Sequence, residues 1–88
     1  MKNFFEDAVA KVQKMNIKNI PDETLLDLYG LYKQSLFGDI TGPKPNYFFI
    51  KTKEAYKWEA WNICKGMSKD EAMFEYVELV KQLNNLKK

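Results

Sequence analysis

Apolar residues recur at intervals of three and four along most of the chain, the spacing that places them on one face of an α-helix. This pattern predicts four helices, at about residues 3–15, 21–37, 52–65 and from 68 almost to the C-terminus. No useful length of the sequence alternates as a half-buried strand would. We therefore expect an all-α fold.

Helix-end signals support these boundaries. Pro21 suits a first helical turn, and Gly38 suits the end of the same helix. Thr52 is a typical N-cap, and Gly66 is a typical terminator for the third helix. The sequence "SKDE" at 68–71 is a capping box, in which the serine and the glutamate satisfy each other's backbone donors.

The connection between the second and third helices is long. Glycines and prolines in the stretch 38–52 rule out a regular helix and indicate an ordered loop. Loops longer than about 12 residues are uncommon in compact domains and are often functional. We expect the aromatic residues Tyr47, Phe48 and Phe49 to pin this loop to the body of the protein.

Length and composition predict one globular domain over residues 1–88. A chain of 88 residues buries roughly 60 to 65% of its unfolded surface, which is enough for one modest core. Hydrophobic residues make up 45% and charged residues 30%, a balance typical of folded proteins. The net charge of +2 does not favour a dedicated nucleic-acid-binding protein.

The chain contains no histidine, and Cys64 is its only cysteine. It therefore cannot build the usual zinc sites, a Ser-His-Asp triad or a Cys-His pair, so we do not expect an enzyme. The single cysteine and the lack of a hydrophobic signal stretch after Met1 favour a cytoplasmic location. No apolar run approaches the roughly 20 residues that span a membrane.

The second helix carries an unusual group of residues. Tyr29, Tyr32 and Lys33 share one face, where a tyrosine pair is most often part of the core. Gly30 lies among them, although glycine inside a helix costs about 0.8 to 1.0 kcal/mol relative to alanine. Such a glycine usually has a packing reason or a ligand-approach reason.

The third helix offers lysines and tryptophans. Lys53 and Lys57 lie four residues apart and share a face. Taken alone they are solvated surface residues, but they could converge with Lys33 on one anionic group. We expect Trp58 and Trp61 to act as core anchors. Cys64 on the same inward stripe should be a small buried hydrophobe rather than a reactive thiol.

Several stretches, taken in order, make the sequence resemble the acyl-coenzyme A binding protein family. They are "LYGLYKQ" (28–34), "GDI" (38–40), "KWEAWN" (57–62) and "KGMSKDEAM" (65–73), followed by Tyr76. The resemblance covers nearly the whole chain. It implies a four-helix bundle of up-down-down-up topology, with a long loop between helices two and three.

The resemblance also implies a function. It predicts non-catalytic binding of medium- to long-chain fatty acyl-CoA esters, which the protein transports and maintains as an intracellular pool. The acyl-CoA is the ligand, and no cofactor is implied. We expect a monomer that binds no nucleic acid, does not insert stably into membranes and contacts acyl-CoA-using enzymes or membranes transiently.

The resemblance assigns the ligand contacts by position. They are Tyr29, Gly30, Leu31, Tyr32, Lys33, Lys53, Lys57 and Tyr76. Lys33 would face a ligand phosphate, and Lys57 would lie near the adenine and the 3'-phosphate. The tyrosines would line the head-group and adenine region. For Gly30, the hypothesis is that a missing side chain makes room beside the nucleotide, so that Gly30→Leu would impair binding more than folding.

Two positions depart from the family pattern. The helix-one lysine of the family aligns with Gln13, so that contact is weakened or taken over by Lys14. The loop before helix three is about two residues longer than expected, so Lys51 rivals Lys53 as the basic contact.

Two further alternatives stay open. Leu25, Leu28 and Met73 are candidates for lining the acyl groove, but each is equally suited to the core. The alternative function is a helical protein-interaction module that uses the exposed face of the second helix or the aromatic segment 47–49.

Overall fold

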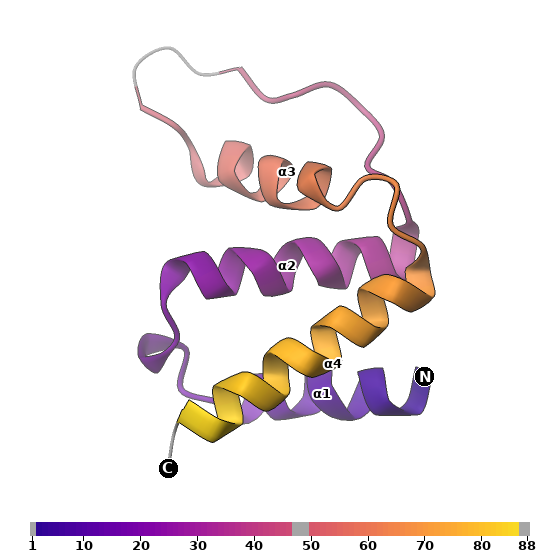
Figure 1. The fold of residues 1–88 in the computed structure, drawn as a ribbon. Coiled ribbons are helices and arrows are strands. Elements are labelled where there is room, and N and C mark those ends of the chain that lie inside the picture. The colour runs from indigo at the N-terminus through magenta and orange to yellow at the C-terminus, as the bar shows by residue number, and fades with distance from the viewer. Residues whose placement is uncertain (1, 47–49, 87–88) are drawn as a thin grey trace.

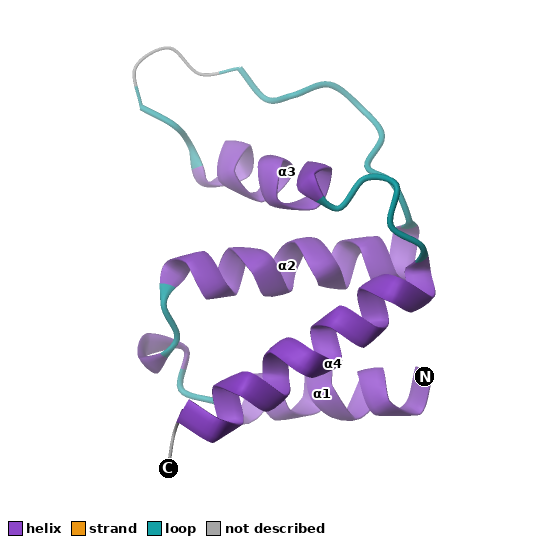
Figure 2. Ribbon diagram, in the orientation of Figure 1, coloured by secondary structure: helices purple, strands orange, loops and turns teal. Residues whose placement is uncertain are grey.

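The computed structural model describes residues 2–46 and 50–86 of the chain. Within them lie the helices α1 (Lys2–Lys14), α2 (Asp22–Phe37), α3 (Lys53–Ile63) and α4 (Lys69–Leu86), and a short 3-10 helix, η1 (Ile17–Asn19). Figure 2 shows helices and loops but no strand in this part of the chain. The predicted all-α fold is confirmed, with helix ends within two residues of those expected.

The helices form an up-down-down-up arrangement. In Figure 1, α1 and α4 run in one direction, whereas α2 and α3 run in the other. The parallel pair α2 and α3 requires the long connection after α2, which returns the chain to the level at which α2 began. Helix α2 packs against α3 on one side and α4 on another, and α1 packs on α4. The expected position of Tyr47, Phe48 and Phe49 lies outside the described residues.

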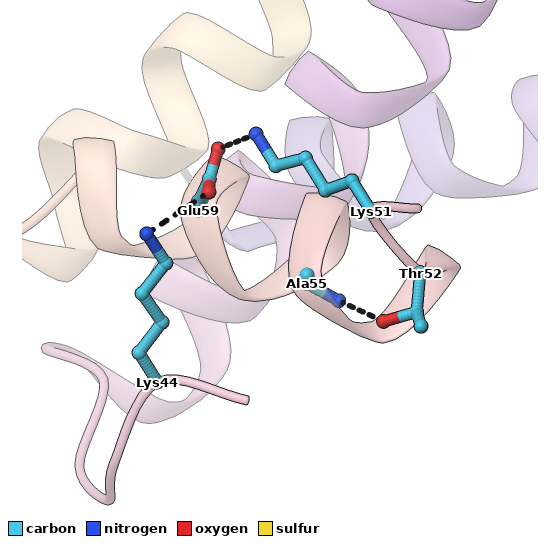
Figure 3. Close-up of polar contacts among 5 residues, drawn as sticks. All are labelled: Lys44, Lys51, Thr52, Ala55 and Glu59. Atoms are coloured by element: carbon cyan, nitrogen blue, oxygen red, sulfur yellow. Dashed lines mark hydrogen bonds and ion pairs between the residues drawn. The ribbon is translucent and has the colours of Figure 1, made fainter. Parts of the chain in front are cut away.

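The predicted caps are present. The Thr52 hydroxyl accepts a hydrogen bond of 3.1 Å from the backbone N–H of Ala55 at the start of α3 (Figure 3). At the start of α4, the Ser68 hydroxyl accepts from the Glu71 N–H at 3.0 Å, and the Glu71 carboxylate accepts from the Ser68 N–H at 3.3 Å. Gly38 ends α2 with a positive φ of 77°, which glycine adopts without strain.

The core lies where α1, α2 and α4 meet. Its buried members include Phe5 and Ala8 from α1, Leu28 from α2, and Tyr76 and Val80 from α4. These residues belong to the helical stripes that the spacing predicted. Burial of these stripes, rather than helix propensity, holds short helices together in water.

A polar cluster joins the end of α2 to the turn between α3 and α4. The Gln34 side chain is completely buried, and its amide nitrogen donates to the Asp39 carboxylate at 2.8 Å and to the Met67 carbonyl at 2.7 Å. The same Asp39 oxygen accepts from the Gly66 N–H at 2.8 Å. These hydrogen bonds lower the pKa of Asp39 below its ordinary value, and the hydrogen bond from Gly66 has the largest effect. The cluster therefore orients α3 and α4 relative to α2.

Candidate functional site

Two lysines from different helices flank the Tyr29 ring. The ammonium nitrogen of Lys33, one turn later in α2, lies 5.8 Å from the ring centroid, and that of Lys57 in α3 lies 5.4 Å from it. Both distances fall within the range of cation–π attraction. The parallel course of α2 and α3 places residue 57 beside residue 29. The structure thus brings together three of the residues predicted for the site.

The Lys33 ammonium contacts further aromatic rings. It lies 5.0 Å from the centroid of Phe37 and 5.8 Å from that of Trp61. The Trp61 indole N–H donates to the Gly38 carbonyl at 2.8 Å, which holds the tryptophan against the end of α2. Trp61 was expected only as a core anchor, so these neighbours of Lys33 were not predicted.

The cations of this region remain available to an anion. Within residues 2–46 and 50–86, Lys33, Lys53 and Lys57 form no ion pair with a carboxylate. An ammonium group without a carboxylate partner can bind a phosphate without first breaking an existing ion pair.

Lys51, the rival of Lys53, has a different environment. Its ammonium group contacts the Glu59 carboxylate, to which Lys44 also comes within 3.4 Å (Figure 3). The hydrogen bond from Lys51 is the main cause that lowers the pKa of Glu59. Lys51 also lies 4.6 Å from the Tyr56 ring centroid. In this structure Lys51 is therefore engaged with Glu59, whereas Lys53 faces the groove described next.

An open groove of about 590 Å³ lies between the N-terminal halves of α2 and α3. It is lined by Asp22, Glu23, Leu25, Leu26, Lys53, Tyr56 and Lys57. Of the three candidates for an acyl groove, only Leu25 lines it. Leu28 is buried in the core, and Met73 packs against the core. Because Lys57 borders both the groove and the Tyr29 ring, the apolar and the cationic regions are continuous.

Tyr32 and Tyr76 belong to a neighbouring aromatic cluster around Phe5. The Phe5 ring centroid lies 6.1 Å from that of Tyr32 and 5.1 Å from that of Tyr76, and the two tyrosines are 6.3 Å apart. Tyr76 is only 3% exposed, and its burial, with a smaller effect of Tyr32, raises its pKa to about 12. Tyr76 is therefore mainly a core residue, while Tyr32 is half-buried. Their contacts with a ligand stay predictions.

Gly30 has a packing reason. A Cβ atom placed on it would lie 2.3 Å from the carbonyl oxygen of Ala60 in α3, far inside van der Waals contact. The missing side chain thus allows α2 and α3 to approach. The α3 backbone fills the space that a side chain would occupy, so the hypothesis that this space lies beside a nucleotide is wrong. For the same reason Gly30→Leu should impair folding first. The neighbouring Leu31 lines a different groove, between α2, α3 and α4.

Among the described residues, Cys64 is a buried thiol and the carboxylates do not gather as metal ligands. Cys64 is only 7% exposed, and burial, with a smaller contribution from Asp27, raises the pKa of its thiol. This agrees with the expected small buried hydrophobe. In the part of the chain that the structure describes, no three potential metal ligands cluster.

Comparison with known proteins then decides the family. The sequence model described as "Acyl CoA binding protein" matches residues 2–80. The chain belongs to the acyl-CoA-binding protein family. It is 45% identical over 83 residues to an acyl-CoA-binding protein of Brassica napus, covering 94% of this chain and 87% of that protein. It is 46% identical over 79 residues to one of Saccharomyces cerevisiae, covering 90% and 87%.

Solved structures of acyl-CoA-binding proteins share the fold. The crystal structure of Oryza sativa acyl-CoA-binding protein 2 superposes with a TM-score of 0.89 at 40% identity, covering 98% of this chain and 92% of that one. The solution structure of the Babesia bovis protein gives a TM-score of 0.78 at 36% identity, covering 94% and 92%. The family is one of non-catalytic binding proteins. No described helix has the length and apolar character needed to cross a bilayer.

Sequence reasoning missed four groove residues of this acyl-CoA-binding protein family member. Asp22 and Glu23 are two of them, and Leu26 and Tyr56 are the two that give the groove apolar surface. Leu26 precedes Tyr29 by three residues, and Tyr56 follows Lys53 by three. Helical spacing therefore placed each on the face that carries a predicted contact. Both residues would have been found by including the neighbour one helical turn away from Tyr29 and from Lys53.

Proposed function

We propose that this chain binds medium- to long-chain fatty acyl-CoA esters without reacting with them, and that it carries and buffers them inside the cell. The observation that carries the proposal is the junction at Tyr29. There, two ammonium groups with no described ion-pair partner flank an aromatic ring, beside an apolar groove. A fatty acyl-CoA has the matching parts, namely several phosphates, an adenine ring and an alkyl tail.

The head group would bind at the cationic end. Lys33 and Lys57 approach Tyr29 from two helices, so phosphates placed there would meet two positive charges. An ammonium group binds phosphate as a point charge, and an exposed ring edge or face accommodates a nucleobase. We propose Lys53, at the groove, as a further basic contact, and half-buried Tyr32 as part of the wall toward the head group.

The tail would bind in the groove between α2 and α3. Leu25, Leu26 and Tyr56 give it apolar walls. Burial contributes about 0.8 kcal/mol per CH₂, so a sixteen-carbon tail offers on the order of 10 kcal/mol before the cost of ordering it. Tail length should therefore set affinity, while the lysines should distinguish acyl-CoA from a free fatty acid.

We assign different roles to the other predicted contacts. Tyr76 is buried, so it would support the ligand site by packing against the Tyr32 ring rather than by offering an exposed ring to the ligand. Gly30 and Leu31 would act through helix packing and not as ligand contacts.

We further propose that residues 1–88 work as one monomeric acyl-CoA-binding domain in the cytoplasm. The family match over residues 2–80 supports the single domain, and the unpaired, buried thiol of Cys64 is in line with a reducing compartment. Transient contact with acyl-CoA-using enzymes or membranes would allow loading and unloading.

Isothermal titration calorimetry with a series of CoA esters tests the main proposal. Affinity should rise with chain length until the groove is filled, free CoA should bind weakly, and free fatty acid should bind more weakly than its CoA ester. The protein and the CoA ester should both remain unchanged after incubation. The absence of binding, or an affinity independent of chain length, would refute the proposal.

A further inference from the structure

A second groove lies on another side of α2. It has a volume of about 310 Å³, runs between α2, α3 and α4, and shares no lining residue with the candidate ligand groove. Its apolar lining includes Leu31, Ile63, Met67 and Leu79. Ile63 is 82% exposed although it is a large apolar residue at the end of α3. Leu31, Met67 and Leu79 are half-buried, so together with Ile63 they leave apolar surface in this groove that the side chains of a partner can cover.

The charged residues of this second groove are all acidic. Asp27 contributes from α2, and Glu75 and Glu78 contribute from α4; none of the described lining residues is basic. Within the described chain, Asp27 and Glu75 form no ion pair, and Glu78 pairs only with the exposed Lys81, at 3.3 Å. The groove is thus a negative surface on a chain whose net charge is +2.

This charge excludes several occupants. A CoA head group or an anionic membrane surface carries negative charge and would be repelled by the three carboxylates. A protruding, positively charged helix fits both the shape and the charge.

We propose that this second groove docks a basic amphipathic helix of a partner protein. The apolar side chains of that helix would cover Leu31, Ile63 and Leu79, and its lysines or arginines would reach Asp27, Glu75 and Glu78. This is helix-in-groove recognition, in which apolar anchors give affinity and rim charges give specificity and orientation. Because the two grooves share no lining residue, the partner could dock while the candidate ligand groove stays open.

The test uses a synthetic peptide of about 15 residues, which forms roughly four helical turns with leucine on one face and lysine on the other. It is titrated into the isotope-labelled full chain and followed by NMR. Chemical-shift changes should cluster at Ile63, Cys64, Glu75, Glu78 and Leu79. A peptide with glutamate in place of lysine should not bind, and added salt should weaken the lysine peptide.

Two double variants with the same change of charge separate the groove from general attraction. Glu75→Gln/Glu78→Gln should weaken the peptide about fivefold, as expected for the loss of two rim ion pairs. Glu6→Gln/Asp7→Asn changes two exposed acids of α1 and should leave affinity unchanged. Shifts away from the groove, equal effects of both variants, or self-association through this face in ultracentrifugation would overturn the proposal.

Discussion

Substitution of Gly30 separates a packing role from a ligand role. An alanine Cβ would lie 2.3 Å from the Ala60 carbonyl oxygen and 2.7 Å from its carbon. Ordinary contact begins at 3.4 Å, so α2 and α3 would have to move apart by about 1 Å. The atoms in the way belong to the backbone, so no side-chain rotation can relieve the overlap.

Two opposing terms set the size of the effect. Replacing glycine with alanine inside a helix gains about 1 kcal/mol from backbone entropy. Overpacking a tight contact typically costs 1–3 kcal/mol, and a contact with backbone belongs near the upper end of about 3 kcal/mol. We expect Gly30→Ala to lower the free energy of unfolding by about 2 kcal/mol, and Gly30→Leu to lower it further.

Urea denaturation followed by circular dichroism measures this change. Asp27→Ala is the matched control, because Asp27 is exposed on the same helix, and its effect should stay within about 0.5 kcal/mol. If the glycine served only to leave room for a ligand, Gly30→Ala would be more stable than the native chain by about 1 kcal/mol. A Gly30→Ala protein as stable as the native one would refute the packing explanation.

Three further predictions concern charge. Lys33→Ala and Lys57→Ala should each weaken acyl-CoA binding by about 1–3 kcal/mol in calorimetry, as for a lost charge-assisted hydrogen bond, and unchanged affinity in both would remove them from the site. Because the hydrogen bond from Gly66 lowers the pKa of Asp39, its stabilising effect is present above the ordinary pKa of 3.8 and is lost as the pH falls through the folded-state value. Acid unfolding should thus depend less steeply on pH in Asp39→Asn, and an unchanged slope would contradict this. Because burial raises the pKa of Tyr76 from 10.0 to about 12, stability should fall as the pH rises between these values, and Tyr76→Phe should remove that part of the loss. An ultraviolet titration should show a tyrosine component near pH 12 that is missing in the variant.

Features that depend on neighbours in sequence could be predicted from the sequence alone. The apolar spacing predicted the helices, and the caps at Thr52 and Ser68 follow from side chains that reach only three residues along the chain. The 3-10 helix Ile17–Asn19 was not expected, because a turn stabilised by the Asn16 side chain leaves no periodic pattern. The third helix ends at Ile63, two residues before the predicted end, since the chain turns through Cys64 before it reaches Gly66.

Features that depend on contact between helices could be predicted only in part. The family resemblance grouped Lys33, Lys53 and Lys57, but spacing could not show that Lys57 lies beside Tyr29. Nor could it show that Leu31, adjacent to a predicted tyrosine contact along the chain, lines a groove that shares no residue with the candidate ligand groove. Successive residues on a helix point about 100° apart, so a continuous sequence motif spreads over several surfaces of the folded protein.

The contact at Gly30 connects a residue next to a predicted site residue in sequence with a contact between two helices. Gly30 is one residue from Tyr29, and Ala60 is three residues from Lys57, so the approach of the two backbones sets how far Lys57 stands from the Tyr29 ring. A separation of about 1 Å would therefore move one ammonium group of the site relative to the other, without touching any ligand contact. Gly30→Ala should then lower acyl-CoA affinity even in the folded fraction, whereas Asp27→Ala should not. The glycine thus contributes to the proposed binding site by setting the distance between the helices that carry its cations.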